Sequence, residues 1–131
     1  MIYSIAVYGS PYANPSSLAA LRFSQAVIAA GHSIYRVFFY HESVHTGSLL
    51  ATPAQDQTSL HEQWSTLATD YDIELIVCIA AALKRGVIDE QEADRWNKQG
   101  HNIGSPFILS GLGQLIDATT SADRHISFGV Q

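Results

Sequence analysis

The sequence of 131 residues has one cysteine, few charged residues and no strongly basic segment. A single cysteine, Cys78, excludes an internal disulfide and favours a reducing, cytoplasmic location. Seven Lys and Arg residues against twelve Asp and Glu residues give a net charge of −5. A face that binds nucleic acid needs clustered positive charge, and the longest basic run is the pair Lys84–Arg85. Direct nucleic acid binding is therefore not expected.

The N-terminal segment MIYSIAVYGS also lacks basic residues and is too short to span a bilayer. We predict a first strand there instead of a signal peptide, and no membrane partner. A hydrophobic fraction of 47% is typical of a globular domain that buries a core. We expect one domain, residues 1–131.

Strand-like and helix-like segments alternate along the chain. Strands are predicted at residues 2–8, 33–40, 75–78, 107–109 and 124–128, and helices at 15–30, 43–50, 60–71, 80–85, from 89 and from 112. Apolar spacing predicts that Tyr71 and Trp96 lie on the inner faces of their helices. The alternation predicts an α/β fold, a three-layer α/β/α sandwich with a mostly parallel sheet of four to five strands.

Cys78 is predicted to end a buried strand and to precede a helical turn. In an open α/β sheet, functional sites form at this carboxyl edge, and the N–H groups of a following helix favour a thiolate. Lys84, Arg85 and the loop of residues 9–12 are candidate neighbours that tune the thiolate. Alternatively, Cys78 is a buried small hydrophobic residue, and Lys84 and Arg85 form a solvated helix end.

Two further patterns have simpler explanations. His41-Glu42-Ser43-Val44-His45 matches the H-E-x-x-H signature of zinc proteases. Gly47 leaves little room for the stable helix that this signature requires, and no third ligand stands out, so a polar loop is expected. Residues 110–113, Ser-Gly-Leu-Gly, resemble a phosphate-binding turn, but glycine-assisted helix entry explains them better. No dinucleotide fingerprint follows the first strand.

The chain is similar to the DsrE-like sulfur-relay family over nearly its whole length. The order and spacing of several segments, each ordinary alone, support this resemblance. The most specific segment is VCIAAALKRGVIDE, residues 77–90. The others are residues 8–12, 23–32, 37–40, 53–56, 107–115 and 122–124.

The resemblance implies that Cys78 accepts a persulfide sulfur from an upstream carrier protein and passes it to a downstream one. The wobble uridine of certain tRNAs is the implied final acceptor. Two paralogous small subunits, B and C, are the implied partners in a hetero-oligomer of paired trimers. Persulfide transfer between thiols needs neither a metal nor an organic cofactor, so none is expected.

Three alternatives stay open. The chain could be a subunit of a dissimilatory sulfur-oxidation relay, which uses the same chemistry in another pathway. It could be a non-catalytic scaffold subunit in which Cys78 is only buried. A zinc hydrolase built on His41 and His45 is the third, and it requires stoichiometric metal in the purified protein.

Overall fold

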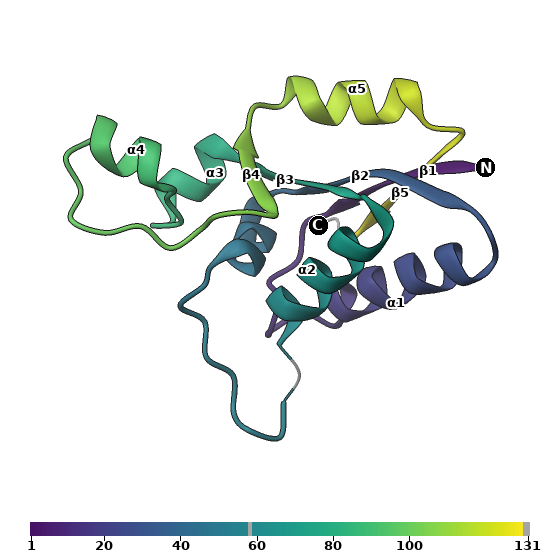
Figure 1. Cartoon of the computed structure of the whole chain (residues 1–131), viewed down its shortest axis with the longest axis horizontal. Helices are drawn as coiled ribbons and strands as arrows, with labels where there is room; N and C mark the ends of the chain where they lie inside the picture. The colour runs from purple at the N-terminus through teal and green to yellow at the C-terminus, as the bar shows by residue number, and fades with distance from the viewer. Residues whose placement is uncertain (58, 130–131) are drawn as a thin grey trace.

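A computed structural model of the chain describes residues 1–57 and 59–129, and in this part strands and helices alternate (Figure 1). The strands are β1 (Ile2–Val7), β2 (Ser33–Phe39), β3 (Glu74–Cys78), β4 (Phe107–Ser110) and β5 (Arg124–Phe128). The α-helices are α1 (Pro15–Ala29), α2 (Leu60–Tyr71), α3 (Ile79–Lys84), α4 (Glu90–Arg95) and α5 (Gly113–Ser121), and η1 (His41–Gly47) is a 3-10 helix. The predicted alternation is confirmed, and the helix expected near residues 43–50 is the shorter and tighter η1.

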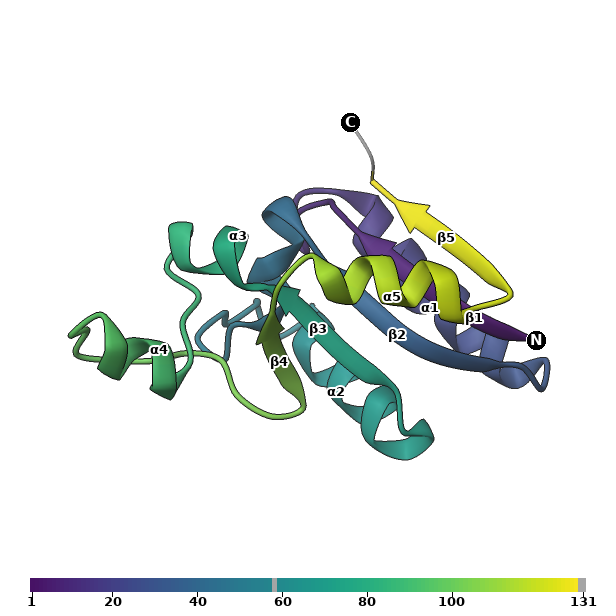
Figure 2. The ribbon, with the colours of Figure 1, turned by 90° about the horizontal axis from the view of Figure 1, so that it is seen from above.

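The strands form one sheet in the order β4-β3-β2-β1-β5, and every neighbouring pair is parallel. Helices α1 and α2 cover one face, and α5 lies on the other (Figures 1 and 2). This confirms the predicted three-layer α/β/α arrangement. Helices α3 and α4 extend beyond the carboxyl edge of the sheet, at the left of Figure 1. Among the described residues, no helix is long and apolar enough to cross a membrane.

Local sequence signals explain where the helices begin. The side chain of Asn14 accepts a hydrogen bond from the Ser16 N–H at 2.9 Å, and Pro15 occupies the first turn of α1. The Ser59 hydroxyl likewise accepts from the Glu62 N–H at the start of α2. Gly31 follows α1 with φ +87°, a left-handed conformation that glycine adopts without strain.

Strand β2 shows how the two faces of the sheet differ. The ring of Phe39 meets the ring of Trp64 in α2 edge-on, with centroids 5.4 Å apart. Arg36 points to the opposite face and contacts α5. The β2–β3 register pairs Arg36 with Glu74 and Phe38 with Ile76, so these four side chains share the α5 face.

Two predicted inner-face residues are exposed, so those predictions were wrong. Tyr71 is the last residue of α2, and the chain leaves the helix at Asp72, whose φ is +54°. Trp96 follows the last residue of α4, donates from its indole N–H to a Glu92 carboxylate oxygen at 3.2 Å and stacks under Arg95. In both cases the residue lies at the C-terminal end of its helix, and the buried stripe stops short of it.

A charged cluster around Arg36 fixes α5 on the sheet. The buried guanidinium donates to Glu74 at 2.5 Å, to the Gln114 carbonyl at 2.7 Å and to Asp117 at 2.9 Å. The Tyr35 hydroxyl also donates to Asp117, and this bond, followed by the bond from Arg36, lowers the pKa of the Asp117 carboxyl. The cluster therefore joins β2, β3 and α5 by charge-assisted bonds.

Replacing Arg36 is expected to destabilise the fold. Arg36→Met leaves the Gln114 carbonyl without this donor, which should lower the free energy of unfolding by about 1–3 kcal/mol. Because folding lowers the Asp117 pKa, the wild type should lose stability as the pH falls through that lowered value, and the variant should lose less. Urea denaturation at several pH values measures both effects. Arg95→Met, at an exposed site, is the control and should change stability by under about 0.5 kcal/mol.

Candidate functional site

The candidate site lies at the carboxyl edge of the sheet. Because all strands are parallel, the segments that follow β1, β2 and β3 meet there. They are the loop of residues 8–14, helix η1, and Cys78 with α3. Helix η1 packs against both β3 and α3, so these segments form one continuous region.

Cys78 is the last residue of β3 and the residue that caps α3, as the sequence predicts. It pairs in register with Ser110 of β4. Because side chains alternate along a strand, Cys78 points to the same face as Ile76, which is the α5 face. Its exposed fraction is 2%, so the isolated chain buries the thiol. Helix α3 has six residues, so it offers a thiolate only a short helix dipole.

The two basic candidates differ in their surroundings. Lys84 ends α3 with an exposed side chain. Arg85 donates from Nε to the Glu42 carboxylate and from Nη1 to the Ala81 carbonyl at 3.2 Å. The bond from Arg85 lowers the pKa of the Glu42 carboxyl. The positive charge of Arg85 is therefore largely matched by a carboxylate, and that of Lys84 lies in solvent.

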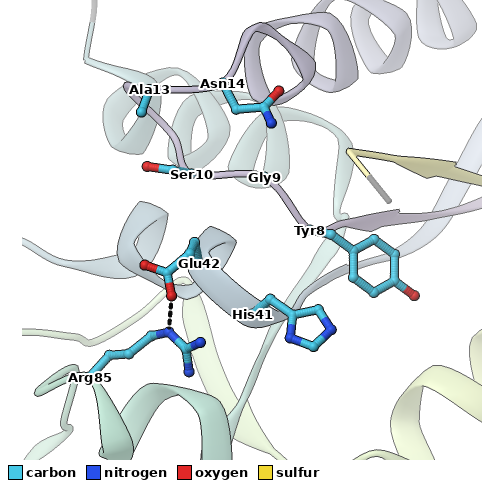
Figure 3. Close-up of a pocket in the computed structure, with 8 residues that line it drawn as sticks. All are labelled: Tyr8, Gly9, Ser10, Ala13, Asn14, His41, Glu42 and Arg85. Carbon is cyan, nitrogen blue, oxygen red and sulfur yellow. Dashed lines mark hydrogen bonds and ion pairs between the residues drawn. The ribbon is translucent and has the colours of Figure 1, made fainter. Parts of the chain in front are cut away.

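A pocket of about 630 Å³ opens between the loop after β1 and the start of η1 (Figure 3). Its walls include Tyr8, Gly9, Ser10 and Asn14 from the loop, His41 and Glu42 from η1, and Arg85 beyond α3. The structure thus brings the predicted neighbours Arg85 and the 9–12 loop to one pocket. Cys78 is not one of the residues that line this pocket, and its side chain is buried.

The H-E-x-x-H segment forms η1 and lacks the α-helix of the protease signature. His41 has φ +51°, and its ring stacks on Tyr40 with centroids 4.2 Å apart. Glu42 pairs with Arg85, and His45 Nε2 lies 3.7 Å from Glu42 Oε1. Within residues 1–57 and 59–129, no three His, Cys, Asp or Glu side chains form a group that could hold a metal ion. Residues 110–113 lead into α5, as expected for helix entry.

Sequence reasoning missed an aromatic cluster at the same edge. The rings of Tyr8 and Tyr40 have centroids 5.9 Å apart, and His41 lies 5.5 Å from Tyr8. Tyr8 and Tyr40 each follow the last residue of a neighbouring strand, so parallel pairing brings them together. The sequence shows that each tyrosine ends a predicted strand. It does not show that these two strands pair, and only this pairing brings the two rings together.

The fold and the edge cysteine define an all-parallel α/β/α protein with a thiol at the carboxyl edge of its sheet. The profile of the DsrE/DsrF-like family matches residues 1–128, and the chain belongs to that family, as predicted. It is 45% identical to the sulfurtransferase TusD homolog of Pseudomonas aeruginosa over 98% of each chain. It is 41% identical to sulfurtransferase TusD of Salmonella newport, over 98% of this chain and 100% of that one.

Two further proteins are similar to the chain over nearly its whole length. The chain is 42% identical to the DsrE protein of Allochromatium vinosum, over 98% of this chain and 99% of that one. The crystal structure of the ychN protein from E. coli has a TM-score of 0.76 at 20% identity, over 98% of this chain and 100% of that one, which supports the fold alone. Whole-length similarity to named sulfurtransferases confirms the predicted sulfurtransferase class.

The ion pair at the pocket can be tested by titration. Arg85→Met should raise the Glu42 pKa toward that of an ordinary glutamate, because the main cause of its lowering is lost. Lys84→Met is the matched control and should leave the Glu42 pKa unchanged. Carbon-detected NMR of the Glu42 carboxyl against pH measures both. An equal shift in the two variants would contradict the assignment of Arg85 as the partner.

Proposed function

We propose that this protein is a sulfur-relay subunit that carries a persulfide on Cys78 and serves 2-thiolation of the tRNA wobble uridine. The observation that supports the proposal most is the position of its only cysteine, at the end of an inner strand on the carboxyl edge. Similarity to relatives named TusD agrees with the proposal.

The chemistry is two successive thiol exchanges. The Cys78 thiolate attacks the outer sulfur of a persulfide on the upstream carrier, so one S–S bond forms as the donor's S–S bond breaks. The donor cysteine leaves as a thiolate and takes up a proton. In the second step a thiolate of the downstream carrier attacks the outer sulfur on Cys78, which leaves as a thiolate. Neither step changes the overall redox state, so neither needs an external oxidant, a metal or an organic cofactor.

Burial of Cys78 is consistent with protecting a persulfide from solvent, in the way that excluded water suppresses side reactions. Transfer nevertheless requires contact between two sulfur atoms, so the edge must open when a partner binds. Local opening of short elements costs less free energy than global unfolding. The same burial favours a second candidate function, a scaffold subunit whose cysteine is only a core residue.

The proposed partners are two paralogous subunits, B and C, in a hetero-oligomer, together with an upstream and a downstream carrier. The net charge of −5 suits protein partners better than tRNA itself, and we place the protein in the cytoplasm. The same chemistry would serve dissimilatory sulfur oxidation, an alternative that similarity to a DsrE protein keeps open. If this protein restored tRNA thiolation in a bacterial strain that lacks its own TusD, the result would favour the tRNA pathway.

The persulfide proposal predicts a specific change in mass. The protein, incubated with a cysteine desulfurase, cysteine and the upstream carrier, should gain one sulfur atom that a reductant removes. Cys78→Ser, which has nearly the same side-chain volume, should keep the fold and gain none. Intact-protein mass spectrometry under non-reducing conditions measures the gain. Sulfur uptake by the Cys78→Ser variant would contradict the proposed mechanism.

If no sulfur is gained, a labelling control distinguishes a scaffold subunit from a relay subunit whose thiol was not accessible to the donor. A small thiol reagent applied to the native protein, alone and with the partner subunits, reports whether Cys78 becomes accessible. If the reagent labels Cys78 in the complex but no sulfur is transferred, the scaffold function is favoured over the relay.

A further inference from the structure

Four side chains with a hydroxyl or thiol group lie at one level of the sheet, where its strands end. Cys78 pairs in register with Ser110 of β4. The last register pairs of β1, β2 and β3 immediately precede Tyr8, Tyr40 and Cys78. The Tyr40 N–H donates to the Val7 carbonyl at 2.9 Å, which extends the pairing by one residue. Cys78 therefore has a hydroxyl-bearing neighbour on each side, Tyr40 after β2 and Ser110 on β4.

Cys78 and its two neighbours differ in exposure. Cys78 is 2% exposed, whereas Tyr40 and Ser110 are half-buried. A persulfide adds a second sulfur at about 2 Å from Sγ, and adjacent strands are about 4.8 Å apart. The outer sulfur of a Cys78 persulfide therefore covers much of the distance to a neighbouring strand, and on either side it approaches a residue with a hydroxyl group.

Of these two hydroxyl groups, that of Ser110 is the better placed to bind sulfur. The Tyr40 ring is held by other aromatic rings, because it stacks on His41 with centroids 4.2 Å apart and meets Phe38 edge-on at 6.1 Å. Within residues 1–57 and 59–129, the Ser110 hydroxyl donates to no protein group and is not among the fully buried polar atoms. Since a serine hydroxyl rotates to suit its partner, it is free to donate toward a sulfur on Cys78.

We propose that Ser110 holds the outer sulfur of the Cys78 persulfide by donating a hydrogen bond to it. The inference deepens the proposed function, on which it rests for the existence of the persulfide. An ionised outer sulfur is an acceptor, and hydrogen bonds to charged groups are stronger than those between neutral groups. Ser110 thus binds the sulfur that is to be transferred, and its register with Cys78 fixes where that sulfur lies.

The hydrogen bond should keep the sulfur on the protein between the two transfer steps. When a thiolate attacks the outer sulfur, the S–S bond to Cys78 breaks and negative charge develops on the Cys78 Sγ. The bond from Ser110 to the outer sulfur is therefore stronger before transfer than during it. An interaction that is stronger in the ground state than in the transition state slows the step. Ser110 should therefore slow the loss of sulfur to small thiols.

The test compares the full-length wild type with Ser110→Ala, Ser110→Thr and Tyr40→Phe, and with Ser33→Ala at the exposed start of β2 as a control. Each protein is loaded with inorganic polysulfide. The Cys78 thiolate attacks a polysulfide sulfur, so one S–S bond forms as another breaks and a shorter polysulfide leaves. After removal of the excess, dithiothreitol is added, and intact-protein mass spectrometry follows the loss of the added sulfur.

A second measurement separates a hydrogen bond from a change in the fold. Iodoacetamide labelling of the unloaded proteins reports how readily the edge opens, because the Cys78 thiol is buried. A substitution that only loosens the edge should speed labelling and sulfur loss together. A substitution that removes a bond to the outer sulfur should speed sulfur loss alone. Circular dichroism verifies the fold of each variant.

Ser110→Ala is expected to lose the added sulfur about tenfold faster than the wild type, with an unchanged labelling rate. Ser110→Thr keeps the hydroxyl and should restore slow loss, and Ser33→Ala and Tyr40→Phe should lose sulfur at the wild-type rate. Wild-type loss in Ser110→Ala would overturn the inference. So would an equal increase in its labelling rate, or faster loss in Tyr40→Phe in place of Ser110→Ala.

Failure of the relay and failure of this inference give different results. If the wild type takes up sulfur from polysulfide but not from a carrier protein, the relay function fails, and the rate in Ser110→Ala still decides the role of Ser110. If the carrier loads the wild type and Ser110→Ala retains sulfur equally well, the relay stands and the inference is wrong. If neither source loads a thiol that iodoacetamide labels, both are wrong.

Discussion

The parallel direction of all five paired strands is the constraint on which the rest of the structure depends. Parallel pairing requires a crossover after each strand, and these crossovers supply the helical layers. It also brings every strand's carboxyl end to one edge, where residues far apart in the sequence become neighbours. Glu42 and Arg85 meet there to form an ion pair, and Cys78 ends its strand beside them in the fold.

Local signals in the sequence were sufficient to predict the order of strands and helices along the chain. The helices predicted at residues 15–30, at 60–71 and from 89 are present, and Asn14, Ser59 and Asp89 cap them. The predicted strand segments form the sheet. The rotation of α5 was not predictable in this way. Its apolar residues suggest a helix, but Asp117 binds Arg36 of β2 and thereby turns Ile116 outward. A contact between residues 81 positions apart leaves no periodic trace in the sequence.

The candidate site was also only partly predictable from the sequence. The placement of Cys78 at a strand end was predictable, because a short apolar run gives way to helix formers at that residue. The pairing of Arg85 with Glu42 was not, because the two lie 43 residues apart and meet only through the β2–β3 pairing. The H-E-x-x-H pattern shows that a local sequence match can mislead. Its residues match the zinc-protease signature, but Glu42 forms an ion pair with Arg85 and the segment is a 3-10 helix.

A buried thiol and a transfer function are compatible if the elements around the thiol open without disturbing the sheet. Cys78 lies in a strand whose ladder with β2 and β4 is continuous, so the strand itself is held firmly. The segments next to it are short: η1 has seven residues and α3 six, and a part-exposed ion pair joins them. Such pairs contribute little to global stability. Opening at this edge therefore breaks that ion pair and also exposes Val44, Ala81 and Ala82 of the buried core. Contact with a partner has to offset this local cost while the sheet and Trp64 stay folded.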